Sequence, residues 1–448
     1  MRITWVQPED LLVHELRQSA DEGKDVTAIA KRWAAAGGSL EPPVRGASEP
    51  GATPELRALA EDLLAELAVL PDPGGHDEPG ELLQTLATAP GPIEAPQGAE
   101  LRERLHGGWL GRAAGCLLGK PVEKIPRHGI REILEESGRW PLRGYFTARG
   151  LPDEVAARWP WNRASRTTSL AEVIDGMPED DDLNYSLLAL YLLERHGPEF
   201  GTEDVAAAWL SLLPAGRVFT AERAAYRNLL EGVEPPATAT VRNPYREWIG
   251  AQIRGDVYGW ACPGDPRRAA ALAVKDARLS HTRNGIYGAM YVAAMTSAAC
   301  VTTDVGQVLD AGLSVLPPGS RLAGAVHEAR RLAASHAFEG AVDRLYESYG
   351  ELHWVHVLNN AALVTLALAA GGGDFADSIC LVVSGGWDTD SNGATVGSIT
   401  GTMCGAAALP EYWSVPLGNR LASSMPGFDG LAFDALADRT LALAEASR

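Results

Sequence analysis

The sequence predicts an all-α protein with one large domain and a small N-terminal extension. Segments with apolar residues at helical spacing recur from residue 7 to residue 386. Few stretches alternate polar and apolar residues, and the short valine-rich runs are too few to form a sheet. The chain has 448 residues, which is too long for one ordinary core and suggests a main domain with an appendage.

The first part of the chain, residues 1–98, is predicted to be a helical extension followed by a linker. Two segments with helical spacing lie between residues 7 and 36. A third, 53–70, starts with Thr53 as a cap, a proline in the first turn and an early acid, as helices do. The Pro- and Gly-rich stretches 71–80 and 89–98 predict a linker or an arm, so the main domain is expected to span 99–448.

The main domain is predicted to be helical throughout. Strong helix formers or helical spacing occur at 100–119, 182–197, 202–215, 265–281, 285–300, 359–370 and 374–386. Two segments carry glycine at every fourth position, namely Gly107, Gly111, Gly115 and Gly119, and Gly393, Gly397, Gly401 and Gly405. Such a stripe lets another helix approach closely, and this tight packing must offset a cost of up to about 1 kcal/mol per helical glycine.

Composition and charge argue against several classes of partner. The net charge of −19 predicts a surface that repels nucleic-acid phosphate, and no run of Lys and Arg suggests a local exception. The longest apolar stretch, 285–301, contains Gly, Ser, Thr and Tyr, which favours a buried helix over a membrane span. The N-terminus lacks a signal-peptide pattern, and the five cysteines are scattered without a CxxC pair, so a cytoplasmic protein without disulfides or zinc is expected.

Asp388, Asp390 and Ser391 stand together at the start of the second glycine-rich segment. Residues two apart in an extended or turning segment point the same way, so the two carboxylates converge and repel each other. A proton, a cationic side chain or a metal ion relieves such repulsion, and no Lys or Arg lies nearby in the sequence. Carboxylate and hydroxyl oxygens suit Mg²⁺, Mn²⁺ or Ca²⁺. The simpler alternative is an aspartate that caps a helix.

Glu179, Asp180, Asp181 and Asp182 form a second acidic cluster directly before a strongly apolar helix. The helix dipole stabilises one or two acids at this position, but four exceed what capping can use. A solvated acidic helix start is the alternative. Two such clusters, each opening a buried helix, together predict a metal centre built from two helix N-termini.

Two further segments contain candidate functional residues. Glu123 follows the expected end of the helix at 100–119 and Pro121, and so lies in a loop, where catalytic groups often occur. His281 and Arg283 precede a glycine-containing helix start, a place suited to an anionic substrate. A surface glutamate and a capping or core histidine are the alternatives.

In their order and spacing, four segments resemble the ADP-ribosylglycohydrolase family. They read GRAAGCLLGKPVE (111–123), EDDDLNY (179–185), SHTRNGIYGA (280–289) and GWDTDSNGATVGSITG (386–401). The resemblance covers about residues 100–415. It implies an all-α fold, two divalent cations (Mg²⁺ or Mn²⁺) in a central cleft, and an ADP-ribosyl or related ribosyl substrate.

The resemblance also implies roles for single residues. Asp181 and Asp182 match the paired aspartates of the family's first acidic motif, and Asp180 falls where the family has threonine, although a shift of one would place Glu179 there. The implied metal ligands are Asp180, Asp181, Asp182, Asp388, Asp390 and Ser391, with Ser391 in place of a threonine. Glu123 matches a glutamate that acts near the scissile bond in some members of the family.

Three departures from the family pattern indicate a subfamily with an altered substrate. Cys116 replaces an aspartate of the opening motif, and Asp180, in place of a threonine, makes the site more negative. Trp387 stands where many members have glycine, and either stacks on a base or ring of the substrate or packs in the core.

The predicted function is therefore metal-dependent hydrolysis at the anomeric carbon of an ADP-ribosyl or related ribosyl group. The metals would bind ribose hydroxyls and activate a water molecule, with Glu123 or Asp181 as general acid or base and His281, Arg283 and Trp387 as substrate contacts. Two alternatives stay open: a non-catalytic binding or structural member of the fold, and a hydrolase of a nucleoside or secondary-metabolite bond.

Overall fold

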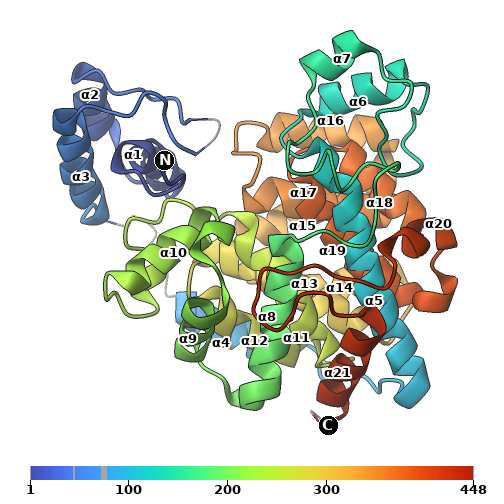
Figure 1. Ribbon diagram of the computed structural model, residues 1–448. Helices are drawn as coiled ribbons and strands as arrows, with labels where there is room; N and C mark the ends of the chain where they lie inside the picture. The colour runs from blue at the N-terminus through green and yellow to red at the C-terminus, as the bar shows by residue number, and fades with distance from the viewer. Residues whose placement is uncertain (1, 44–45, 72–77, 447–448) are drawn as a thin grey trace.

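The computed structural model describes residues 2–43, 46–71 and 78–446. These residues form helices and connecting loops without a β-strand, and extended pairing is limited to isolated bridges such as the one between Met177 and Leu421. The all-α prediction is confirmed. Figure 1 shows α1 to α3 grouped beside the main body, which holds the remaining helices and the C-terminus.

The helices follow one another through the whole chain. The α-helices are α1 (Pro8–Asp21), α2 (Thr27–Ala35), α3 (Pro54–Ala68), α4 (Glu78–Thr88), α5 (Gly98–Gly119), α6 (Arg127–Glu136), α7 (Asp153–Arg158), α8 (Asp181–His196), α9 (Thr202–Leu212), α10 (Thr220–Leu230), α11 (Asp256–Trp260), α12 (Pro266–Ala277), α13 (Arg283–Ala299), α14 (Val305–Ser314), α15 (Arg321–Ser335), α16 (Phe338–Tyr349), α17 (Val357–Ala370), α18 (Phe375–Ser384), α19 (Thr389–Cys404), α20 (Glu411–Ser414) and α21 (Phe433–Ala446). Short 3-10 helices lie between them: η1 (Lys120–Val122), η2 (Gly197–Glu199), η3 (Ala215–Arg217), η4 (Ala237–Ala239), η5 (Ile249–Arg254), η6 (Ala406–Ala408) and η7 (Val415–Leu417).

The predicted helices are present, with differences at their ends. The cap expected at Thr53 forms, since its hydroxyl accepts a hydrogen bond of 3.2 Å from the Leu56 amide. The stretch expected to be a linker or an arm contains α4, because the segment between its two Pro- and Gly-rich ends is rich in helix formers. Residues 72–77 of that prediction lie outside the described residues.

The two glycine stripes pack against each other and place the site. A Cβ atom on Gly111 would overlap the carbonyl oxygen of Gly397, and one on Gly115 would overlap that of Gly393. The helices α5 and α19 are therefore antiparallel and in backbone contact. At the end of this contact Thr389 donates a hydrogen bond of 2.9 Å to the Gly119 carbonyl. The end of α5 and the first turn of α19 thus lie side by side.

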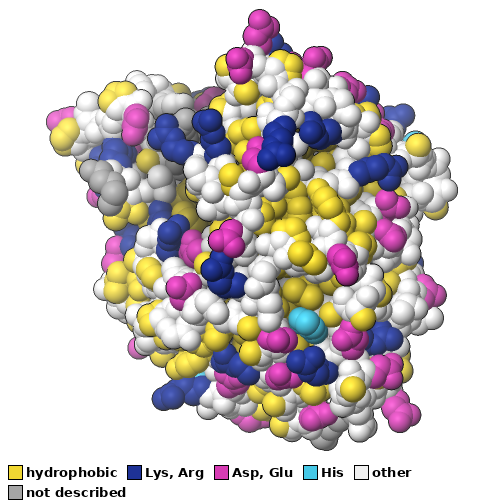
Figure 2. Space-filling model, turned by 45° about the vertical axis from the view of Figure 1, so that its right-hand side comes forward, with side chains coloured by type: hydrophobic (Ala, Val, Ile, Leu, Met, Phe, Trp, Pro, Cys, Tyr) yellow, Lys and Arg dark blue, Asp and Glu magenta, His cyan; other side chains and the backbone are white. Residues whose placement is uncertain are grey.

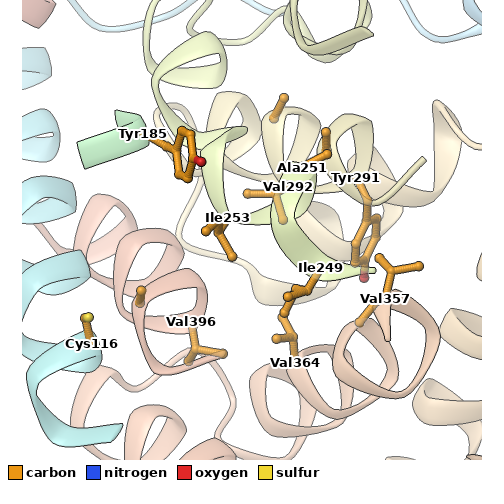
Figure 3. Close-up of a cluster of buried hydrophobic side chains, with 14 of the residues drawn as sticks. Cys116, Tyr185, Ile249, Ala251, Ile253, Tyr291, Val292, Val357, Val364 and Val396 are labelled. Carbon is orange, nitrogen blue, oxygen red and sulfur yellow. The ribbon is translucent and has the colours of Figure 1, made fainter. Parts of the chain in front are cut away.

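The core lies around α13 and α17. Every residue of α13 from Asn284 to Ala299 is buried, as expected of the apolar stretch 285–301. Figure 3 shows part of this core, where side chains from η5, α13, α17 and α19 meet: Ile249, Ala251, Ile253, Tyr291, Val292, Val357, Val364 and Val396. Of the helices in the described part of the chain, none has both the length and the apolar character of a membrane span.

The N-terminal extension docks on the main domain through aromatic and charged contacts. The ring of Trp5 meets the rings of Tyr245 and Trp248 edge-on, with centroids 5.6 and 6.0 Å away. Beside them, Glu15 accepts two hydrogen bonds of 2.9 Å from the buried guanidinium of Arg246. On the face seen in Figure 2, acidic and basic side chains are interspersed and do not form a basic patch.

Candidate active site

A cleft of about 290 Å³ gathers acids from both predicted clusters and from the end of α5. The acids that line it are Glu123, Glu179, Asp180, Asp181, Asp182, Glu222, Asp388 and Asp390, and Ser391 lines it too. The acidic starts of α8 and α19 therefore lie in the same cleft. The α5–α19 contact places the first turn of α19 beside the end of α5, and Lys120, which follows α5, contacts Asp180 at the start of α8.

Asp180 is the N-cap of α8 and pairs with a lysine. One of its carboxylate oxygens accepts a hydrogen bond of 2.9 Å from the Asp182 amide, and the other contacts the ammonium group of Lys120. Burial alone would raise the pKa of Asp180, but the Lys120 charge and these hydrogen bonds hold it below its ordinary value. Asp180 is thus an anion with a partner for each oxygen.

Asp182 connects α8 to α5 and α19. One carboxyl oxygen lies 3.4 Å from the Arg112 guanidinium, and the other accepts a hydrogen bond of 3.2 Å from the Ser391 hydroxyl. Arg112 is fully buried and also forms an ion pair of 2.8 Å with Asp256. Burial and the neighbouring Asp180 raise the pKa of Asp182 well above its ordinary value.

Asp181, Asp388 and Asp390 face the cleft without a basic partner. Within residues 2–43, 46–71 and 78–446, no Lys, Arg or His forms an ion pair with any of these carboxyls. Burial raises the pKa of all three, to about 7 for Asp390, where the charges of Glu123 and Asp180 add to the effect. The Asp388 amide is fixed by a hydrogen bond of 3.2 Å to the side-chain oxygen of Asn360.

Glu123 lies directly after η1, in the loop expected from the sequence. Its carboxylate accepts a hydrogen bond of 2.6 Å from the Asn162 amide and lies 3.0 Å from the Lys124 ammonium. Glu123 lines the same cleft as Asp388 and Asp390, and its charge helps to raise the pKa of both.

Comparison with known proteins identifies the family. The family model for ADP-ribosylglycohydrolases matches residues 97–448. The chain belongs to the ADP-ribosylglycohydrolase family. A solved structure described as an ADP-ribosylglycohydrolase-related protein complex is 21% identical to it, covers 78% of this chain and 99% of that chain, and superposes with a TM-score of 0.47. A comparison with curated proteins finds no match.

In this member of the family, His281 and Arg283 lie outside the acidic cleft. The His281 ring is buried, shares a hydrogen bond of 2.8 Å with the Ser280 hydroxyl, and has a pKa lowered well below its ordinary value by burial. This is the environment of a core histidine. Arg283 lines a separate cavity of about 800 Å³ together with Asp21 and Arg321. Neither position supports the substrate contact expected from the sequence.

Trp387, Cys116 and Glu179 occupy three different places. Trp387 is buried and stacks on Tyr346, with ring centroids 4.3 Å apart, so it matches the core-packing alternative and does not line the cleft. The Cys116 sulfur is buried within 4.8 Å of oxygens of Asp180 and Asp182. Glu179 lies at the rim, where it forms an ion pair of 3.2 Å with Arg217.

Sequence reasoning missed Lys120, Arg112 and the rim. Lys120 and Arg112 both stand inside the opening glycine motif, but nothing in that motif shows which acids they approach. The rim carries Lys124 and Arg217 beside three aromatic residues, Trp5, Phe219 and Trp354, and the Lys124 ammonium lies 5.9 Å from the centroid of the Trp354 ring. Trp5 comes from the N-terminal extension, which therefore forms part of the cleft wall.

Proposed function

We propose that the protein is a divalent-metal-dependent glycohydrolase that cleaves the anomeric bond of an ADP-ribosyl or related ribosyl group. One observation carries the proposal: the carboxyls of Asp181, which is half-buried, and of Asp388 and Asp390, which are buried, converge on one cleft without a basic partner among the described residues. Family membership supports glycohydrolase chemistry, and the free state of all five cysteines agrees with a cytoplasmic setting.

The donor set fits a hard divalent cation. Carboxylates of Asp181, Asp388 and Asp390 and the hydroxyl of Ser391 offer the oxygen ligands that Mg²⁺ and Mn²⁺ prefer. Their raised pKa values reflect burial and mutual repulsion, which a cation would relieve. When bound, such an ion would polarise ribose hydroxyls and lower the pKa of a water molecule.

Glu123 is the preferred proton carrier. Asn162 and Lys124 orient its carboxylate toward the cleft, where it can take a proton from the attacking water or return one to the leaving group. Asp181 lines the same cleft and is the second candidate for this role, which would take it out of the ligand set. Positive charge would develop on the sugar in the transition state, and the surrounding carboxylates would stabilise it.

The rim suits a substrate with both an anionic and a flat part. Lys124 and Arg217 are half-exposed cations, with side chains 53% and 56% exposed, that can meet phosphate oxygens. Phe219 and Trp354 offer ring faces close by. A nucleoside or another glycoside without phosphate would contact only the aromatic rings and leave the two cations unused. These cations therefore favour an ADP-ribosyl substrate.

A non-catalytic binder is the second candidate, and the Lys120–Asp180 pair favours it, since a side chain here neutralises an acid expected to bind metal. One experiment separates the candidates. Wild type and Asp388→Asn are compared for Mn²⁺ content, for the rise in melting temperature with Mg²⁺ or Mn²⁺, and for release of ribosyl product from ADP-ribosylated peptides, nucleotides and nucleosides.

The proposal expects wild type to bind metal, gain stability and release product, and Asp388→Asn to lose all three. Asp374→Asn is the matched control, because Asp374 stands at the N-cap position of α18 as Asp388 does in α19 but lies outside the cleft, and asparagine caps as well as aspartate. Metal binding without turnover would favour the binder. No metal response in the wild type would contradict both the metal centre and the hydrolysis.

A further inference from the structure

We propose that the Lys120 ammonium takes the place of one divalent cation, so that the centre holds a single ion on the side of Asp388 and Asp390. The family resemblance implies two ions, and this chain departs from that number through its own residues. The inference rests on the proposed function, since it concerns the same metal centre.

The position of Lys120 is fixed by the fold. The residue opens η1 directly after Gly119, whose backbone packs on Thr389 and Asp390 without room for a side chain. The Lys120 side chain is only 11% exposed. Its ammonium contacts Asp180 and lies 3.4 Å from the Glu179 carbonyl oxygen. The cation is therefore held in the acid cluster and has little room to swing into solvent.

The carboxylate oxygens of Asp180 and Asp182, which lie beside Lys120, already have partners. Both carboxylate oxygens of Asp180 have partners, one the Asp182 amide and the other Lys120. Both oxygens of Asp182 also have partners, in Arg112 and Ser391. A metal ion here would have to displace these contacts.

Cys116 weakens this position further. Its sulfur and oxygens of Asp180 and Asp182 lie within 4.8 Å of one another, which is the spacing of a three-ligand metal site. A buried neutral thiol is a poor ligand for Mg²⁺ or Mn²⁺, however, since these ions prefer oxygen. Lys120 already neutralises Asp180 there, and a divalent ion beside an ammonium group would be repelled.

Within the described residues, the carboxyls on the other side of the cleft have no cation to balance their charge. Asp388, Asp390 and Asp181 line the cleft, and in the part of the chain that the structure describes none of them pairs with a basic side chain. A single divalent ion satisfies these carboxyls, with Lys120 as the second, permanent cation of the centre.

The test is the number of Mn²⁺ ions bound per chain, measured by equilibrium dialysis with elemental analysis. Electron paramagnetic resonance of the bound Mn²⁺ distinguishes an isolated ion from a magnetically coupled pair. Wild type is compared with Lys120→Met, which keeps the length and removes the charge. Lys124→Met is the control, because Lys124 is the next lysine but contacts Glu123 at the rim.

We expect one isolated Mn²⁺ in wild type and in Lys124→Met, and a second ion with a coupled signal in Lys120→Met. Two ions in the wild type would overturn the inference and leave the proposed function standing. One ion in both wild type and Lys120→Met would also overturn it, since Lys120 would then not be what excludes the second. No ion in any of these proteins would instead refute the metal centre of the proposed function, and this inference with it. If Lys120→Met does not fold, Lys120→Gln replaces it.

Discussion

Gly115 of α5 and Gly393 of α19 meet backbone to backbone, and neither has room for a side chain. A Cβ atom on either residue would overlap the carbonyl oxygen of the other. This contact fixes how far α19 slides along α5. It thereby sets the distance between the acids at the start of α19 and the residues that follow α5, Lys120 and Glu123.

Replacing Gly115 with alanine is expected to destabilise the protein by about 1–3 kcal/mol or more, as overpacking of a core does. The obstructing atom belongs to the backbone of Gly393 and cannot rotate away as a side chain would. Urea denaturation measures the loss. Gly324→Ala in α15 is the control, since nothing lies within 4 Å of its added Cβ, and it should be neutral or stabilising by up to about 1 kcal/mol. Equal effects of the two substitutions would contradict the role of the contact.

The sequence predicted each glycine stripe to pack closely on a helix, but not that the two stripes pack on each other. Helical spacing identifies a face, whereas the partner of that face depends on topology. The meeting of the acidic clusters was predicted because repulsion between acids that open buried helices requires a common cation. The sequence did not show that Lys120 supplies the cation for Asp180. Which acid a lysine approaches depends on how η1 and α8 are placed in the fold.

Positions next to a motif were the least predictable. His281 precedes α13, as expected, but its ring turns into the core, where Ser280 satisfies one nitrogen. Trp387 adjoins Asp388 in the sequence, yet its backbone φ of 54° directs the ring onto Tyr346. Sequence proximity to the site therefore did not determine side-chain direction.

Glu123→Gln is expected to lower kcat by roughly 10²–10⁴-fold, the usual contribution of a general acid or base. Mn²⁺ affinity should fall far less than kcat, because Glu123 pairs with Asn162 and Lys124 and lies outside the proposed ligand set. Steady-state kinetics and a Mn²⁺ titration on the same preparation provide both readouts. Glu132→Gln is the control, since Glu132 pairs with Arg158 away from the cleft. Unchanged kcat in Glu123→Gln would transfer the role to Asp181.

Trp5→Ala is expected to loosen the N-terminal extension. The ring is 8% exposed, and truncating a buried tryptophan typically costs about 3–5 kcal/mol, here from the docking of residues 2–43 on the main domain. Limited proteolysis should release an N-terminal fragment faster than in wild type. Ile3→Ala, at a side chain 53% exposed, should not change the rate. Substrate affinity should fall in Trp5→Ala as well, because Trp5 lines the cleft; an intact affinity with a released extension would show that this wall is dispensable.

His14→Phe is expected to reduce the loss of stability in acid. Burial, with a smaller effect of Arg17, lowers the pKa of His14 to about 3 in the folded protein, against an ordinary value of 6.5. As the pH falls below 6.5, the unfolded chain gains a proton that the folded chain does not, so stability is present above this pH and is lost below it. One such group accounts for about 2 kcal/mol between pH 7 and pH 5, at roughly 1.4 kcal/mol per pH unit.

Phenylalanine keeps the edge contact with Tyr245, whose ring centroid is 5.2 Å away, and does not titrate. Denaturant unfolding at both pH values measures the difference, with exposed His336→Phe as the control. A pH dependence in His14→Phe equal to that of wild type would mean that folding does not lower the pKa of His14.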